Sequence, residues 1–143
     1  MSGTTPIQLG RTIPALPAVD VAASVEFYRE RLGFEAVHHD DGFAVLRRDE
    51  AVVHLWQADD ESWNDRAAGE RPICSGAESF LAGTASCRIE VEGVDELCAE
   101  LLGRDVLHPV SREGVTDTDF GTREFATLDR DGNLISFFKW VES

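Results

Sequence analysis

The side chains of this sequence that could do chemistry are its histidines, aromatic rings and carboxylates. The histidines are His38, His39, His54 and His108. They form no HExxH or Cys/His pattern, and the chain has neither a GxSxG nucleophile turn nor a GxxxxGKS phosphate loop. His54 and Trp56 are two residues apart in a run of strand formers, so they share one face of a strand. Ser86, Arg88 and Glu90 share a face in the same way. The pattern favours a binding surface over a catalytic centre.

His54 and Trp56 lie on one of the elements predicted between residues 10 and 58. The expected elements are a strand at 11–16, a helix between Asp20 and Gly33, and strands at 34–39, 43–48 and 51–57. Pro14 interrupts the first strand, which indicates a sheet edge or a hinge. Asp20 is a good helix N-cap, and the apolar residues that follow it have helical spacing until Gly33. The order is strand, helix and three strands.

The same order is predicted again between residues 84 and 140. The expected elements are a strand at 84–91, a helix at 93–103, and strands at 106–110, 123–128 and 134–140. Alternating polar and apolar residues predict the first strand, and an apolar stripe predicts the helix. A long polar loop at 59–83 joins the two modules. We therefore expect one domain that spans residues 1–143.

The last two strands are expected to form a hairpin. The turn DRDGN at 129–133 joins them, because Asp and Asn bond to the local backbone and Gly supplies a positive φ. In the closing strand, Ile135 and Phe137 face one way. The opposite face carries Ser136, Phe138 and Trp140.

Composition narrows the classes of function. The 143 residues are 43% hydrophobic and 28% charged, which are ordinary globular values. The net charge of −14 repels a phosphate backbone, so nucleic acid is not an expected partner. This acidity is either a solubility device or a field that attracts a cationic ligand.

Three cysteines without a CxxC pair indicate reduced thiols. Without a signal pattern or a long apolar run, we expect a cytoplasmic protein and no membrane partner.

Three stretches resemble one known family. FGTREFATLDRDGNLISFF at 120–138 resembles the closing hairpin of the bleomycin-resistance proteins, in the vicinal oxygen chelate (glyoxalase-like) superfamily. DVAASVEFYRERLGF at 20–34 resembles the first helix and second strand of that family, and TIPAL at 12–16 its first strand with the hinge proline. The resemblance covers nearly the whole chain. It implies an α+β fold in which paired βαβββ modules, 10–58 and 84–140, form a curved, mostly antiparallel sheet around a groove.

The metalloenzymes of that superfamily hold a metal in the groove through His, Gln or Glu from four strands. The aligned positions here are Thr12 or Ile13, His54, Ser86 and Ser136. Of these, His54 alone is a normal ligand, and a divalent ion needs several such donors together. We therefore expect neither a metal nor another cofactor.

In the family, flat aromatic side chains sandwich the bithiazole rings of the drug. One aligned position is Phe120 with Gly121, where Trp-Gly is usual, and another is His38, where Phe is usual. A neutral imidazole stacks over a smaller apolar area, and Trp56 could compensate for that loss. Packing in the core is the alternative role for each ring. The predicted ligand-binding residues are His38, Phe43, His54, Trp56, Ser86, Arg88, Asp119, Phe120 and Gly121.

These observations favour a non-enzymatic homodimer that confers antibiotic resistance by sequestration. It would bind a bleomycin-type glycopeptide, or another flat cationic drug, unchanged in grooves at the subunit interface, with or without a metal that the drug carries. In the family, the subunits exchange an N-terminal arm at a proline that aligns with Pro14. Two alternatives stay open. One is a metal-dependent lyase, dioxygenase or thiol transferase of the superfamily with a non-standard ligand set, and the other is a binding module for a different small metabolite.

Overall fold

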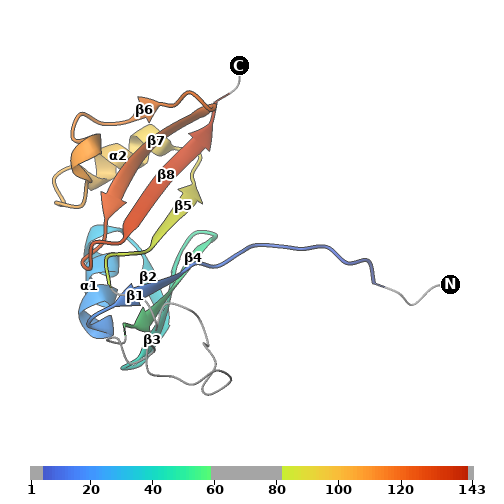
Figure 1. Cartoon of the computed structure of the whole chain (residues 1–143), viewed down its shortest axis with the longest axis vertical. Coiled ribbons are helices and arrows are strands. Elements are labelled where there is room, and N and C mark those ends of the chain that lie inside the picture. Colours follow the sequence, from blue (N-terminus) through green and yellow to red (C-terminus); the bar gives the residue numbers. More distant parts are fainter. Residues whose placement is uncertain (1–4, 59–81, 142–143) are drawn as a thin grey trace.

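The computed structural model describes residues 5–58 and 82–141, which form two modules of the predicted order (Figure 1). The first module contains β1 (Ala15–Ala18), α1 (Val21–Arg31), β2 (Glu35–His39), β3 (Phe43–Arg48) and β4 (Ala51–Gln57). The second contains β5 (Ser86–Glu90), α2 (Val94–Leu101), the 3-10 helix η3 (Pro109–Ser111), β6 (Thr116–Asp117), β7 (Thr122–Leu128) and β8 (Leu134–Trp140). The α+β fold of paired modules is confirmed. The expected connection at 59–83 lies almost wholly outside the described residues.

Each module forms its own four-stranded sheet. The strand orders are β1-β4-β3-β2 and β5-β8-β7-β6. In both sheets the first strand of the module runs parallel to its last strand, and the other pairs are antiparallel. Helix α1 lies beside the first sheet and α2 beside the second (Figure 1). Each sheet therefore has one face that packs into the core and one open face.

The first strand begins later than predicted. The prediction placed it at 11–16, whereas β1 covers Ala15–Ala18 and pairs with β4. Pro14 has no N–H to contribute to a ladder, although its carbonyl oxygen accepts a hydrogen bond from the His54 N–H at 3.0 Å. The residues before it leave the body of the molecule as an extended arm (Figure 1).

The prediction of a strand at 106–110 is wrong. Leu107 makes only an isolated antiparallel bridge to Thr127, and Pro109 then begins η3. A proline cannot donate to a ladder but suits the first turn of a helix. The short β6 takes the edge position beside β7 instead.

Helix α1 begins where its capping signal predicts. Asp20 has an extended backbone, and its side chain accepts a hydrogen bond from the Ala23 N–H at 3.1 Å. Val21, Val25 and Tyr28 are buried on one face of the helix, which therefore packs against the core. No helix within the described ranges is long and apolar enough to cross a membrane.

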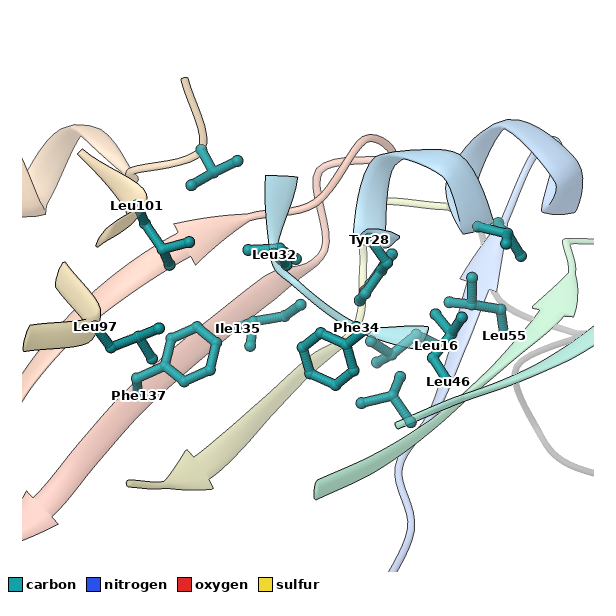
Figure 2. Packing of buried hydrophobic residues seen from close by; sticks show 14 of the residues in the cluster. Leu16, Tyr28, Leu32, Phe34, Leu46, Leu55, Leu97, Leu101, Ile135 and Phe137 are labelled. Atoms are coloured by element: carbon teal, nitrogen blue, oxygen red, sulfur yellow. The ribbon is translucent and has the colours of Figure 1, made fainter. Parts of the chain in front are cut away.

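One hydrophobic core connects the two modules. Figure 2 shows it continuing from α2 across β8 to α1 and the first sheet. The labelled members on this path include Leu97, Phe137, Ile135, Leu32, Tyr28, Phe34, Leu16 and Leu46. Phe125 and Phe137 stack within it, with ring centroids 5.4 Å apart. Because the core is shared, burial of apolar surface fixes one sheet relative to the other.

The turn between β7 and β8 fastens the second module to the first, and we call this contact the inter-module clasp. The Asn133 Nδ2 group donates to the Pro17 carbonyl at 2.8 Å and to Asp129 Oδ2 at 3.0 Å. Asn133 Oδ1 accepts from the Gly83 N–H at 3.0 Å. The Tyr28 hydroxyl donates to Asp129 Oδ2 at 2.8 Å. Asn133 is thus completely buried and still hydrogen-bonded on both ends of its amide.

The same turn also holds the start of α1. Asp131 accepts hydrogen bonds from the Val19 N–H at 2.9 Å and from the Ser24 hydroxyl at 2.7 Å. Gly132 has φ +89°, so the predicted positive φ of the turn is confirmed. Burial raises the pKa of the Asp129 carboxyl and raises the pKa of Tyr28 well above its usual value, so Tyr28 remains a donor. Every buried side-chain nitrogen and oxygen in the described ranges has a partner.

Candidate functional site

Four predicted binding residues meet on the open face of the first sheet, and we call His38, Phe43, His54 and Trp56 the first aromatic face. Phe43 on β3 is the Cα partner of Trp56 on β4. The Phe43 ring centroid lies 4.7 Å from that of Trp56, 5.0 Å from that of His54 and 5.9 Å from that of His38. The sequence-based grouping of His54 with Trp56 is therefore correct. Pairing of β3 with β4 places Phe43 at the centre of the cluster.

The electrostatics of this face follow from its partial burial. Burial lowers the pKa of the His54 imidazole, so this ring is neutral at neutral pH. At the edge of the face, His38 Nε2 lies 3.3 Å from Asp40 Oδ2. The Gly42 N–H donates to Asp40 Oδ1 at 2.9 Å and is the main reason why the pKa of Asp40 is lowered. Neutral rings bordered by a carboxylate suit a flat ligand with a positive group nearby.

The open face of the second sheet carries a different group, which we call the second aromatic face: Arg88, Phe120, Glu124, Phe138 and Trp140. Arg88 on β5 donates to both carboxylate oxygens of Glu124 on β7, at 2.7 and 3.3 Å. Its guanidinium carbon lies 4.7 Å from the Phe138 ring centroid and 5.9 Å from that of Phe120. Phe138 and Trp140 meet edge to face at 5.8 Å. This face combines an ion pair with three rings.

Phe120 stands on a loop that hydrogen bonds hold in place. Gly121 has φ +90°, a left-handed conformation that favours glycine, and its carbonyl accepts from the Val141 N–H at 2.9 Å. The Thr122 N–H donates to Thr118 Oγ1 at 3.1 Å, and the Thr122 hydroxyl donates to Glu124 Oε2 at 2.8 Å. The Phe120 side chain is 64% exposed in this setting. An exposed ring on an anchored loop is available for stacking.

The structure does not bring all the predicted site residues together. The first and second aromatic faces lie on different sheets, and the ring contacts found in the described residues stay within one face or within the core. Ser86 is exposed at the start of β5, and Asp119 is exposed beside Phe120. These two residues belong to the second sheet and its loop rather than to a shared centre.

Three members of the second aromatic face were missing from the predicted site. The alternation of β8 already placed Phe138 and Trp140 opposite the core, and this was the signal for both rings. Glu124 is the Cα partner of Phe138, a pairing that depends on the register of β7 with β8. No pattern in the sequence shows that Glu124 would reach Arg88, which is 36 positions away.

The positions that align with metal ligands form no ligand set. Ser86 is exposed and Ser136 is buried, and a serine hydroxyl is not among the usual ligands of zinc or other transition ions. Thr12 and Ile13 lie on the arm, before the first strand. Within 5–58 and 82–141, no three His, Cys, Asp or Glu side chains are grouped so that they could hold a metal ion.

Comparison with known proteins gives consistent results. A family model for the Glyoxalase/Bleomycin resistance protein/Dioxygenase superfamily matches residues 9–137. The chain is 51% identical over 133 residues to a bleomycin resistance protein of Geobacillus stearothermophilus. This alignment covers 93% of this chain and 98% of the relative. The bleomycin resistance protein of Staphylococcus aureus strain MRSA252 matches with the same identity and coverage.

Solved structures show the same fold. A bleomycin-binding protein from bleomycin-producing Streptomyces verticillus, crystallised with copper(II)-bleomycin, superimposes with a TM-score of 0.68 and 27% identity. The match covers 96% of this chain and 100% of the Streptomyces chain. Family model, sequence relatives and structure agree over nearly the full length, and the resemblance of the closing hairpin is thereby confirmed. The chain belongs to the Glyoxalase/Bleomycin resistance protein/Dioxygenase superfamily.

Proposed function

We propose that this protein confers antibiotic resistance by binding a bleomycin-type drug and leaving it chemically unchanged. The observation that carries the proposal is the 51% identity, almost end to end, to bleomycin resistance proteins. The donor set at the aligned metal positions, with Ser86 and Ser136, argues against the metal-dependent enzymes of the superfamily. Occupancy is then the mechanism: a drug held by the protein cannot cut DNA.

The two aromatic faces would supply the binding energy. Stacking of a flat ring on an aromatic side chain contributes about 0.5–1.5 kcal/mol beyond the burial of apolar area. The net charge of −14 attracts a cationic drug and speeds its association, and salt weakens this effect. Exposed carboxylates add under about 1 kcal/mol for each ion pair. Rings therefore hold the drug, and charge steers it. The predicted site residues His38, Phe43, His54, Trp56, Ser86, Arg88, Asp119, Phe120 and Gly121 remain our candidates.

A second copy of the chain would complete the groove. The two faces lie on different sheets, and in the proposed dimer a face from each of two subunits would enclose the ligand between rings. The arm at 5–14 exposes 94% of Ile7 and 92% of Leu9, and it extends away from the body (Figure 1). Strand β5 is an edge of the second sheet, and a cavity of about 840 Å³ separates it from the root of the arm. An apolar arm and an unpaired edge suit strand addition between copies, with Pro14 as the hinge.

Calorimetry with bleomycin, paired with mass spectrometry of the recovered drug, tests this function. We expect stoichiometric heat and a drug of unchanged mass. A changed drug mass would place the protein among the enzymes, and absence of heat would refute drug binding. Light scattering tests the dimer separately. A monomer of 15.7 kDa at micromolar concentration would contradict the exchanged arm.

A further inference from the structure

The second aromatic face already contains a flat cation in contact with its rings. The Arg88 guanidinium lies over Phe138 at 4.7 Å and over Phe120 at 5.9 Å, both within the reach of about 6 Å for a cation–ring attraction. Two hydrogen bonds to Glu124 fix its position, and Glu124 is itself held by the Thr122 hydroxyl. Hydrogen bonding to Glu124 also raises the pKa of Arg88, so the group stays charged.

This cation changes what the exposed part of Phe120 can bind. The ring face of an aromatic side chain attracts a cation through its negative quadrupole. In Phe120 that capacity is already engaged by Arg88, and a second cation stacked on the same ring would be repelled by the guanidinium charge. Glu124 reduces the net charge of the pair, but the guanidinium is the group that lies over the ring. A neutral ring meets no such repulsion.

The first aromatic face lacks this feature. The cation–ring contacts in the described part of the chain are at Phe27, Phe120 and Phe138. None of these belongs to the first aromatic face, whose border carries the Asp40 carboxylate. The second face has carboxylates as well, Glu124 and the exposed Asp119, but there a guanidinium lies over the rings. The two faces therefore differ in the charge of the ligand group that each accepts.

We propose that Arg88 is a specificity-determining residue, which makes Phe120 a stacking surface for a neutral flat ring and excludes cationic rings from it. This rests on the proposed function and names which part of the drug class meets which face. The cationic part of the ligand then lies off the Phe120 ring, near exposed carboxylates such as Asp40 or Asp119.

Two probes of the same shape and different charge test the proposal. They are acridine in its neutral form and N-methylacridinium, a permanent cation, with binding followed by fluorescence quenching. The variants are Arg88→Met, which removes the charge, Arg88→Lys, which keeps it, and Phe120→Ala. Arg29→Met is the matched control, because Arg29 also pairs with a carboxylate, Glu26, at 2.6 Å, but on the outer surface of α1. It changes the net charge of the protein by the same amount.

We expect wild type to discriminate against the cation, relative to acridine, more strongly than Arg88→Met does. The ratio of the two dissociation constants should shift by about fivefold, or about 1 kcal/mol, beyond any shift in Arg29→Met. Arg88→Lys should keep most of the wild-type ratio, and Phe120→Ala should weaken both probes. An equal ratio in Arg88→Met and Arg29→Met would overturn the proposal, as would unchanged binding of both probes to Phe120→Ala. Bleomycin calorimetry on wild type runs in parallel: absence of heat there refutes the proposed function and leaves the acridine result standing.

Discussion

The two sheets of this protein share strand order and strand direction, yet their open faces have different chemistry. The first carries Phe43 packed against Trp56 and a neutral His54. The second carries rings around the Arg88–Glu124 ion pair. Topology fixes where side chains point, and residue type at those positions decides what they bind. A repeated module thus provides two unlike surfaces on one chain.

The comparison depends first on the inter-module clasp, which holds the two sheets in one arrangement. We expect Asn133→Ala to lower the free energy of unfolding by about 3 kcal/mol, because it leaves the Pro17 carbonyl and the Gly83 N–H without their partner. Urea denaturation measures this. Arg130→Ala, an exposed change in the same turn, is the control and should alter stability by less than about 0.5 kcal/mol. Equal stability of the two variants would show that the clasp is unimportant.

The sequence predicted the local structure of the clasp but not its contacts. The DRDGN turn, the cap at Asp20 and the bounds of β3 and β4 follow from turn, capping and alternation signals within a few residues. The bond from Tyr28 to Asp129 joins residues 101 positions apart, and no local signal encodes it. The error at 106–110 has a similar cause. The residues there favour a strand by propensity, but Pro109 ends the extended segment. The Ser111 hydroxyl then accepts a hydrogen bond from the Ala126 N–H at 2.8 Å.

Cys87 and Arg88 are adjacent on β5 and point to opposite faces of the second sheet, so they test how far the surroundings of the two faces differ. Arg88 faces outward, whereas burial raises the pKa of the Cys87 thiol to about 11. An ordinary cysteine has a pKa of about 8.5, so the thiolate fraction at neutral pH should be lower by about three-hundredfold. We expect Cys87 to react with iodoacetamide correspondingly slowly at neutral pH, measured by peptide mass spectrometry. Protein unfolded in urea should react at the ordinary rate, and equally fast reaction of folded protein would contradict the raised pKa of Cys87.

Removing one ring from each face shows whether both surfaces act on the same drug. We expect Phe120→Ala and Trp56→Ala each to weaken bleomycin binding by about tenfold, through lost stacking and lost apolar area. Phe120→Trp should retain binding, since a larger ring keeps the surface. Calorimetry measures all three, with Val37→Ala, an exposed apolar residue of β2, as the control. Loss of affinity from only one of the two faces would mean that the other has a separate role.

The smallest expected effect concerns the charge of the first aromatic face. Burial lowers the pKa of His54 in the folded state, so the unfolded chain binds more protons as pH falls below about 6.5. This contribution to stability is complete above that pH and is lost as pH falls through the lowered pKa. The melting temperature of wild type should therefore drop slightly more than that of His54→Gln between about pH 7.5 and 5.5. Parallel melting curves for the two proteins over this range would contradict the lowered pKa.

The inter-module clasp also sets the point on the chain at which the N-terminal arm begins to move freely. The Asn133 amide donates a hydrogen bond to the Pro17 carbonyl, and β1 is paired with β4 from Ala15 onward. Only the residues before Ala15 can therefore change direction relative to the core. Core closure uses contacts within a single chain and is therefore a first-order event. In the proposed dimer, engagement of the arm with another copy would be second-order and would depend on concentration. If the proposed dimer forms, each newly made chain would thus complete its core before it meets a partner, and dilution would separate the subunits without opening the core.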